Sequence, residues 1–483
     1  MPQRPRLILA FLSIAAFMTF LDVSIVNVAL PTIEAKLAIP TTQLPYVVTT
    51  YGMLLGGFVL LCGRLADTYG RRRTLRIGLT LFALASLVAG LAQNAVMLIT
   101  ARGAQGLGAA LIATSALSLL TSNFAEGPAR TKALGVWGAL SGLASVAGVT
   151  LGGVLTDGPG WRWIFFINVP IGLAGALVAP LVVDESRGAG RGASFDVPGA
   201  LLLTSGLVVL IFTLGRTVDD SGVPAALVTG GFVLAALLLA GFLLVERRAA
   251  APLIPLGVFR RPSLRAANIT AVLLLGNVVT LFFFASLFMQ QALGYSPMRT
   301  GLAYVPLAVV VAVGAGTASQ LVTRFAARPV LLAGLALVLG GMLLLWRAPA
   351  DSSYPTDILP AFLIAGLGLG TAFVPLQVVA FAGVEEGEAG LAAGLINTSQ
   401  EVGGALGLAV AATFAFRDLD RLTRHAHGVP SLVREARVQV FHDAFLVGAG
   451  LVAAGLAVAL AFLPRRPPVL PVAGEARATA EVG

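Results

Sequence analysis

The chain has very little charge, cysteine or histidine. Charged residues make up 11% of its 483 residues, whereas a soluble protein carries about 25%. The single cysteine, Cys62, excludes an internal disulfide and a cysteine-based metal site. The three histidines, His425, His427 and His442, lie in or beside one polar stretch and form no metal-ligating pattern. These shortages argue against a soluble, a disulfide-stabilised and a metal-binding protein.

Lysine is also scarce, because Lys36 and Lys132 are the only two, so the net charge of +9 is almost wholly due to arginine. A basic balance can indicate nucleic acid binding, but here the arginines lie mostly between apolar segments, where membrane topology explains them better. No phosphate-binding loop of the Gly-x-x-x-x-Gly-Lys-Ser/Thr type is present, which argues against direct use of ATP. We therefore expect no nucleic acid partner, no cofactor and no catalytic residues.

Long apolar segments dominate the chain instead. Hydrophobic residues make up 57% of it and the mean hydropathy is +0.91. A membrane-crossing helix needs about 20 apolar residues. Fourteen segments approach or exceed that length: 7–30, 44–65, 76–93, 97–121, 132–155, 163–183, 197–216, 224–245, 267–290, 300–320, 329–346, 357–381, 390–416 and 440–463. The sequence therefore predicts an all-α polytopic membrane protein with 14 transmembrane helices.

The short loops predict the orientation of these helices. The first segment follows Arg4 and Arg6 and lacks a small-residue cleavage site, so we expect it to be retained as a helix. Most Arg and Lys residues fall in the stretches that are cytoplasmic if the N-terminus is inside, which obeys the positive-inside rule. The stretch 417–439 is the exception, and we expect a long external loop there. Both termini are then cytoplasmic.

An internal repeat divides the chain. Stretch 319–329 has the length and position of stretch 63–73, displaced by 256 residues. Duplicated halves that flank a shared cavity are typical of alternating-access carriers. We expect an N-terminal six-helix bundle, two inserted transmembrane helices, a C-terminal six-helix bundle and a disordered cytoplasmic tail, at 1–190, 191–250, 251–465 and 466–483.

The turn at 63–73 packs an acid and four arginines between two apolar segments. A positive-inside loop explains the arginines but not the Gly-x-x-x-Asp-x-x-Gly frame. An acid beside a helix N-terminus and arginines beside C-termini gain from helix dipoles only while those ends are adjacent. We therefore predict a conformational latch on the cytoplasmic face formed by Gly63, Asp67, Gly70, Arg71 and Arg72.

Five motifs, in this order and spacing, resemble the major facilitator superfamily and specifically its fourteen-helix drug:proton antiporter branch. The resemblance covers essentially the whole chain. The motifs are the turn at 63–73, Leu21-Asp22-Val23-Ser24-Ile25-Val26-Asn27-Val28-Ala29-Leu30-Pro31, Arg102-Gly103-Ala104-Gln105-Gly106-Leu107-Gly108, the stretch from Trp161 to Gly172, and Phe195-Asp196-Val197-Pro198-Gly199. The resemblance implies the major facilitator fold and transport coupled to protons.

Asp22 is the predicted proton-coupling residue. A carboxylate inside a transmembrane segment costs about 2.5–3.5 kcal/mol on insertion scales, so it needs a reason to be there. Burial favours the neutral acid, so its protonation can change with access to either side. Arg102 is its expected partner, because both residues fall in the external half of the membrane. The alternatives are a structural polar contact for Asp22 and a permanent buried ion pair for both.

Glu401 departs from the branch, which usually carries an arginine–glutamine pair where this chain has Gln400-Glu401. It falls close to the middle of segment 390–416. There it is either a second protonation site, a counter-charge for a cationic substrate, or a hydrogen-bonding partner of Asn397 or of a neighbouring helix.

Segment 132–155 resembles the antiporter motif of helix five. Gly135, Gly148, Gly152 and Gly153 are its small residues, which let helices approach closely. Val149 stands where the motif has a proline that would add a kink. The loss of this proline weakens the motif's specific indication of antiport, which the rest of the resemblance still favours.

The substrate pocket is only weakly readable from the sequence. Three consecutive phenylalanines at 282–284 point in different directions on a helix, so we expect at least one to face lipid. The pocket candidates are Asn27, Trp137, Phe284, Phe288 and Gln291.

Together these features predict a monomeric secondary transporter of the bacterial cytoplasmic membrane. It would export hydrophobic, cationic or similar amphipathic drugs in exchange for protons, by alternating access and without a cofactor. A dedicated exporter of one endogenous lipid, siderophore or self-made antibiotic is the alternative. A membrane enzyme would need a clustered His/Asp or Ser/His set, and a sensor would need a soluble domain; we find neither in the sequence.

Overall fold

The computed structural model describes most of the chain, and every regular element in the described part is helical. Some side chains within helices α5, α15 and α17 lie outside the description. The described residues are 5–124, 128–187, 196–217, 224–249, 252, 254, 257, 261–349, 351–381, 389–417 and 430–463.

The helices follow one another with short connections. The first group is α1 (Pro5–Leu37), η1 (Thr41–Gln43), α2 (Leu44–Tyr69), α3 (Arg71–Gly90), α4 (Ala95–Asn123), α5 (Pro128–Asp157), α6 (Trp163–Phe166) and α7 (Asn168–Val182). A pair follows, α8 (Val197–Arg216) and α9 (Ala225–Arg248). The last group is α10 (Pro262–Leu287), η3 (Phe288–Ala292), α11 (Pro297–Ala303), α12 (Val305–Phe325), α13 (Ala327–Trp346), η4 (Tyr354–Ile358), α14 (Leu359–Phe381), α15 (Ala389–Phe416) and α17 (Pro430–Phe462).

In the described residues, twelve helical stretches are long and apolar enough to cross a membrane. The two predicted segments outside this set are 132–155 and 390–416, which correspond to α5 and α15. Helix α5 has a shorter apolar stretch in its described part, Val146–Asp157. The structure therefore shows a polytopic all-helical protein, and the count of fourteen spans stays a prediction.

Segment 163–183 corresponds to one apolar span, Trp163–Val182, although the helix assignment divides it into α6 and α7 at Ile167, which itself has helical dihedral angles. One helix boundary differs from the sequence prediction. Helix α17 begins at Pro430, well inside the stretch 417–439 that we expected to be a loop. Its first turns are polar, so a search for apolar segments misses them, and proline at the first helical position suits a helix start.

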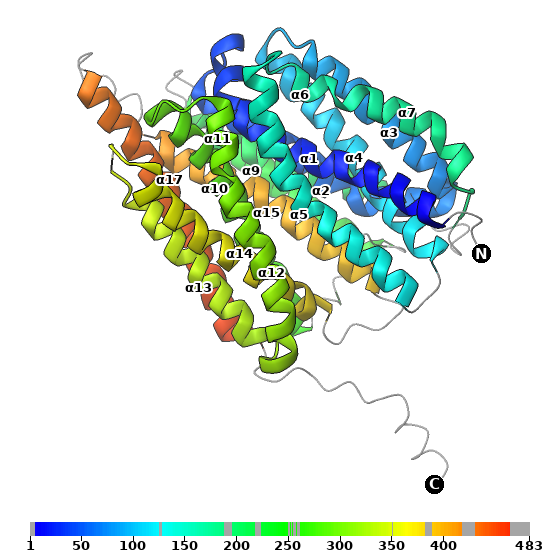
Figure 1. The fold of residues 1–483 in the computed structure, drawn as a ribbon. Helices are drawn as coiled ribbons and strands as arrows, with labels where there is room; N and C mark the ends of the chain where they lie inside the picture. The colour runs from blue at the N-terminus through cyan, green and yellow to red at the C-terminus, as the bar shows by residue number, and fades with distance from the viewer. Residues whose placement is uncertain are drawn as a thin grey trace.

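Helix contacts recur in the two large groups. In the first group the main pairs are α1 with α5, α2 with α4, α3 with α4, and α3 with α7. The corresponding pairs of the last group are α10 with α15, α12 with α14, α13 with α14, and α13 with α17. In Figure 1 the blue-to-cyan helices gather on one side and the yellow-to-red helices on the other. The repeat seen in the loops therefore extends to the helix packing.

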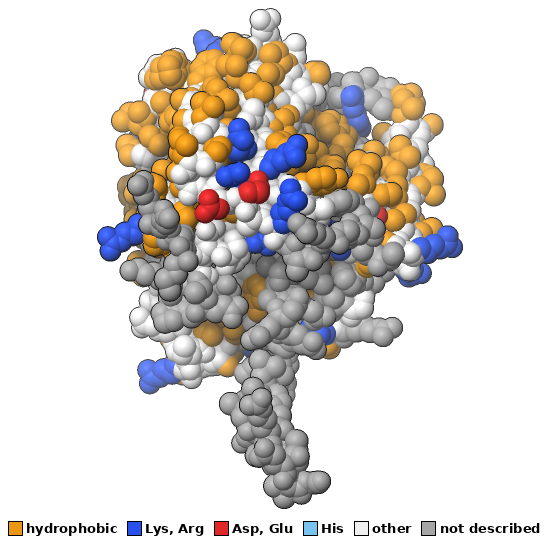
Figure 2. All heavy atoms as spheres, turned by 90° about the vertical axis from the view of Figure 1, so that its right-hand side faces the viewer, with side chains coloured by type: hydrophobic (Ala, Val, Ile, Leu, Met, Phe, Trp, Pro, Cys, Tyr) orange, Lys and Arg blue, Asp and Glu red, His pale blue; other side chains and the backbone are white. Residues whose placement is uncertain are grey.

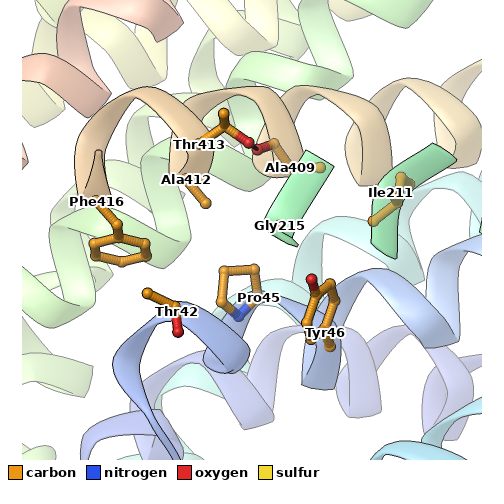
Figure 3. Close-up of a pocket in the computed structure, with 9 residues that line it drawn as sticks. All are labelled: Thr42, Pro45, Tyr46, Ile211, Gly215, Ala409, Ala412, Thr413 and Phe416. Atoms are coloured by element: carbon orange, nitrogen blue, oxygen red, sulfur yellow. Dashed lines mark hydrogen bonds between the residues drawn. The ribbon is translucent and has the colours of Figure 1, made fainter. Parts of the chain in front are cut away.

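The two groups meet mainly where α2 packs against α15 and α5 against α11, with smaller contacts of α5 with α12 and of α1 with α10 and α11. Helices α8 and α9 pack on each other, and α8 also packs against both α2 and α15. Figure 3 shows the place where α2, α8 and α15 meet, around a small pocket lined by Tyr46 of α2, Gly215 of α8 and Thr413 of α15. Thr413 Oγ1 donates to the Leu214 carbonyl at 3.4 Å, and Tyr46 stacks on Phe212.

The outer surface is dominated by apolar side chains. Leu181 is 84% exposed and Leu177 is 74% exposed, as expected for residues that face lipid. Figure 2, which faces the end where the chain starts, shows a small group of basic and acidic side chains among hydrophobic ones. On this face the charged side chains therefore form a small group within a mainly apolar surface.

Candidate functional site: a buried charge cluster in the first helix group

Asp22 and Arg102 form a buried ion pair. Asp22 lies on α1 and is 0% exposed, and Arg102 lies on α4 and is 1% exposed. Arg102 Nη1 donates to Asp22 Oδ2. Asp22 lies on the face of α1 that is turned toward α4, and Arg102 lies on the face of α4 that is turned toward α1. The pairing expected from the sequence is present in the structure, and the role of the pair remains a prediction.

Two amides complete the shell around the carboxylate. Asn168, the first residue of α7, donates from Nδ2 to Asp22 Oδ1 at 2.9 Å. Gln105 of α4 donates to the same oxygen at 3.2 Å and to Ser86 of α3 at 2.7 Å. Donors from α4 and α7 thus reach the carboxylate of α1, and α3 supports one of them through Ser86. This arrangement suits the charged form of Asp22.

Arg102 has partners besides the acid. Its Nε donates to the carbonyl of Val47 on α2 at 3.1 Å, and its Nη1 donates to Gln105 Oε1 at 3.1 Å. The guanidinium also lies over the ring of Tyr51 on α2, 4.3 Å from the ring centre, which gives a cation–π contact. Arg102 therefore keeps several interactions if Asp22 loses its charge.

Gln105 and Asn168 are the site residues that sequence analysis missed. Both lie inside motifs that resemble the antiporter branch, but no role was assigned to either. The available signal was the presence of an amide side chain within an otherwise apolar helix motif, because such a group needs a hydrogen-bonding partner when it is buried. What the sequence does not show is that both amides point at the same carboxylate.

Glu401 lies where the two helix groups meet. It is part-buried on α15 and faces two glycines of α2. A Cβ built on Gly52 would lie 3.6 Å from Glu401 Oε2, and one built on Gly56 would lie 2.7 Å from Glu401 Cβ. No hydrogen bond or ion pair joins Glu401 to Asn397 or to any other described residue. Gly52 directly follows Tyr51 in α2, and the Tyr51 ring contacts Arg102, so Glu401 brings a second acid close to the Arg102 site.

The predicted turn at 63–73 is mostly helical, because α2 continues to Tyr69 and α3 begins at Arg71, so Gly63 and Asp67 lie within α2 and only Gly70 connects the two helices. Gly70 has φ 114°, a conformation that side chains disfavour, so glycine allows the sharp turn. Asp67, in the last turn of α2, accepts from Arg71 Nε at 2.8 Å. Gly63 packs against Thr114 of α4. The described ends of these helices place the acid near a C-terminus and Arg71 near an N-terminus, opposite to the favourable dipole arrangement.

Glu185 provides the favourable dipole interaction that Asp67 does not. It follows α7 and accepts from the backbone amides of Arg72 at 3.0 Å and Arg73 at 3.2 Å, the first residues of α3. Arg72 also pairs with it at 3.7 Å. An acid at a helix N-terminus satisfies otherwise unpaired amides. Glu185 lies far from this turn in the sequence, so no local pattern could have predicted the contact.

The glycines of α5 allow two close helix contacts. A Cβ on Gly148 would lie 1.9 Å from Ser24 Oγ, and one on Gly152 would lie 2.6 Å from the Ile25 carbonyl oxygen, both on α1. A Cβ on Gly153 would lie 2.6 Å from the carbonyl oxygen of Pro297 on α11. Gly135 lies outside the described side chains. The motif thus packs α5 against α1 within its group and against α11 across the contact between groups.

Two predicted pocket residues are packed in the interior of the last helix group. Phe284 is 0% exposed and lies 5.7 Å from the ring of Phe416. Phe288 is 1% exposed and lies edge-on to Phe441 and Phe445. In the run 282–284 only Phe282 keeps some exposed surface, and it stacks on Tyr304. Phe284 and Phe288 are therefore packed within a core.

The remaining pocket candidates contact other helices. Gln291 Nε2 donates to Glu34 Oε2 of α1 at 2.7 Å, so it joins the two groups. The carbonyl of Asn27 accepts from Ser286 Oγ at 2.8 Å at the same contact. Trp137 lies edge-on to Phe20 inside the first group. In the described part of the chain, no three His, Cys, Asp or Glu residues lie close enough to hold a metal ion.

Comparison with known proteins identifies one family and several relatives named for antibiotic resistance or export. A family model described as Major Facilitator Superfamily matches residues 12–408. The puromycin resistance protein pur8 of Streptomyces alboniger is 39% identical, over 82% of this chain and 79% of that protein. The cephamycin export protein CmcT of Amycolatopsis lactamdurans is 38% identical, over 83% and 82%.

A multidrug resistance protein, Stp of Mycobacterium tuberculosis strain CDC 1551 / Oshkosh, is 35% identical over 82% of this chain and 73% of that protein. Among solved structures, a bacterial homologue of the human lysosomal transporter Spinster superposes with a TM-score of 0.70. It covers 97% of this chain and 100% of its own, at 15% identity, and so supports the fold alone.

Proposed function

Because the chain belongs to the major facilitator superfamily of membrane transporters, we propose that it exports amphipathic drugs or antibiotics in exchange for protons. It is an integral membrane protein, and its relatives are antibiotic resistance and export transporters rather than enzymes. The observation that supports proton exchange is the buried Asp22–Arg102 pair inside a shell of hydrogen-bond donors.

The pair suggests how a proton changes the carrier. Without a proton, Asp22 holds α1 against α4 through Arg102 and against α7 through Asn168. A proton on Asp22 removes the charge attraction, which is strong in a medium of low dielectric constant. Arg102 then keeps the Val47 carbonyl and the Tyr51 ring, both on α2. Interactions that differ between two states shift the equilibrium between them, so protonation favours one access state over the other.

Glu401 is the proposed contact for the positive charge of a cationic substrate or a second proton site. It lies on α15 facing Gly52 and Gly56 of α2, close to Tyr51, and has no hydrogen-bond or ion-pair partner among the described residues. Glu401→Gln should weaken export of cationic compounds more than export of neutral ones. Equal effects on both classes would rule out the counter-charge role.

We further propose the architecture and setting of the carrier. Fourteen helices cross the cytoplasmic membrane of a bacterium with both termini inside, as two six-helix bundles and the inserted pair α8–α9. The recurring contact pairs support the two bundles, and the contacts of α8 with α2 and α15 support a position of the inserted pair beside their junction. The carrier works as a monomer, driven by the proton gradient without a cofactor.

A second candidate function is the export of a single antibiotic. The relatives named for puromycin, cephamycin and lincomycin resistance or export favour it. Uptake of a chemically varied panel of dyes and antibiotics into inverted vesicles separates the two candidates. Transport of many unrelated compounds supports multidrug export, whereas transport of one compound class supports a dedicated exporter.

Reconstituted proteoliposomes test the proposal directly. A pH gradient, acidic inside inverted vesicles, should drive uptake of a fluorescent cationic drug while protons leave in the same sample. Asp22→Asn should abolish the dependence on the gradient while the protein stays folded. Drug flux that ignores both the pH gradient and the membrane voltage would refute proton antiport.

A further inference from the structure

One buried polar atom beside Asp22 has no partner. Asn168 is 1% exposed, and its Nδ2 donates to Asp22 Oδ1 at 2.9 Å. The other atom of the same amide, Oδ1, is buried and accepts no hydrogen bond from any residue in the described part of the chain. Buried polar atoms of native proteins are nearly always hydrogen-bonded, so this exception needs an explanation.

The shell around Asp22 suits a carboxylate but not a carboxylic acid. Oδ1 of Asp22 accepts from Asn168 and Gln105, and Oδ2 accepts from Arg102. A carboxylate only accepts hydrogen bonds, whereas the protonated acid has an O–H that must donate. Arg102 has no acceptor atom, so the acceptor for this O–H must be one of the two amides.

Both amide atoms of Gln105 already form hydrogen bonds. Its Oε1 accepts from Arg102 at 3.1 Å, and its Nε2 donates to Asp22 at 3.2 Å and to Ser86 at 2.7 Å. A rotation of this amide would break all three interactions. Asn168 donates only one described hydrogen bond, so rotation about its Cβ–Cγ bond exchanges Nδ2 and Oδ1 without further loss. The amide oxygen and nitrogen occupy nearly the same space, and this torsion is broad.

We propose that Asn168 is a positioning residue whose amide rotates with the protonation state of Asp22. It donates from Nδ2 to the carboxylate and, after half a turn, accepts at Oδ1 from the O–H of the acid. The proton comes from water on the accessible side and stays on Asp22, so no covalent bond of Asn168 changes. This inference rests on the proposed proton antiport and names the group that stabilises both forms of its proton site.

The protonation state of Asp22 decides which way the Asn168 amide faces. One amide atom faces Asp22 and the other has no described partner in either orientation, so the hydrogen bond to Asp22 sets the preference. The charged and titratable side chains that face Asp22 are Arg102 of α4 and, behind it, Tyr51 of α2, with Glu401 of α15 beyond Gly52. The facing groups from α3 and α7 are the uncharged Ser86 and Asn168. Asn168 is the first residue of α7 and Asp22 lies on α1, so this hydrogen bond joins the two helices.

Two transport modes in proteoliposomes test this role. Exchange of labelled for unlabelled drug needs only the substrate-loaded carrier, whereas uptake driven by a pH gradient also needs the protonated carrier to return. Asn168→Leu, which has nearly the same shape, removes the only acceptor for the acid. Gradient-driven uptake should fall about tenfold or more, as expected for an unsatisfied buried hydroxyl. Drug exchange should fall clearly less, because the carboxylate that it requires loses one donor but keeps Arg102 and Gln105.

Two other variants control for damage to the fold. Asn168→Ser keeps a group that donates or accepts, and it should restore most of the gradient-driven uptake. Asn277→Leu removes another fully buried asparagine, on α10, whose amide atoms have no described partner, and both transport modes should be unchanged. Equal losses of uptake and exchange in Asn168→Leu, or no loss of either, would overturn the proposal. A wild-type protein whose uptake ignores the pH gradient would instead refute the proposed antiport itself.

Infrared difference spectroscopy gives an independent readout that needs no transport. The carboxyl stretch that appears on acidification of the wild type and is absent from Asp22→Asn belongs to the protonated acid. In Asn168→Leu this band should move to higher wavenumber, because the O–H has lost its acceptor. An unchanged band in the folded variant contradicts the rotation.

Discussion

Removing one member of the Asp22–Arg102 pair should destabilise the protein in a way that depends on which member is removed. Both side chains are essentially unexposed, so each single variant leaves a charge buried without its partner. Breaking a buried pair in this way costs about 3–5 kcal/mol. Replacing both with apolar residues of similar size, in Asp22→Leu/Arg102→Met, removes the unpaired charge and should cost less than the sum of the single effects.

The pH dependence distinguishes the two single variants. In Arg102→Met a carboxyl is left buried without its cation, and burial disfavours the charged form of an acid. A folded state that binds more protons than the unfolded chain loses stability as the pH rises, so the stability of this variant should fall with pH more steeply than that of wild type. In Asp22→Asn the arginine stays charged at every pH, so this slope should be absent.

Equilibrium unfolding in mixed detergent micelles, measured from pH 5 to pH 8, provides the assay. The wild type is the reference for slopes caused by other groups. Two results would contradict the coupling of the two charges that the structure indicates. One is an equal pH slope for the two single variants, and the other is a double variant whose loss of stability equals the sum of the two single losses.

Three further predictions concern other parts of the fold. Gly56→Ala places a methyl group 2.7 Å from Glu401 Cβ, so α2 and α15 must separate. Such overpacking costs about 1–3 kcal/mol. It should lower cross-linking between cysteines introduced on these two helices about 5- to 150-fold. Glu185→Gln weakens the cap on the two first amides of α3 and should cost about 1 kcal/mol, seen as faster hydrogen exchange in that turn but not in α13. Phe288→Ala should cost about 3–5 kcal/mol of stability because the ring is fully buried; a changed substrate range at unchanged stability would instead assign Phe288 to the pocket.

Much of the site could be predicted from the sequence, because a charged residue in an apolar segment is energetically costly and therefore identifies a candidate functional residue. Asp22 and Arg102 could be predicted as partners, since helix direction and position put both at a similar depth. The glycines of α5 were predicted as helix-packing residues, and Gly148 and Gly152 do contact α1 closely. Phe284 and Phe288 could not be assigned, because apolar residues on a membrane helix face lipid, pocket or core with the same composition.

The sequence by itself determined that the chain crosses a membrane many times and that its two halves are related. Both properties depend on apolar length and on the spacing of charged turns, which are local in the chain. Only the tertiary structure decided that Gln105 and Asn168 surround Asp22, that Glu185 caps α3, and that Glu401 faces the glycines of α2. These contacts join residues from different helices, and which faces meet is set by how the helices pack, which no segment determines alone.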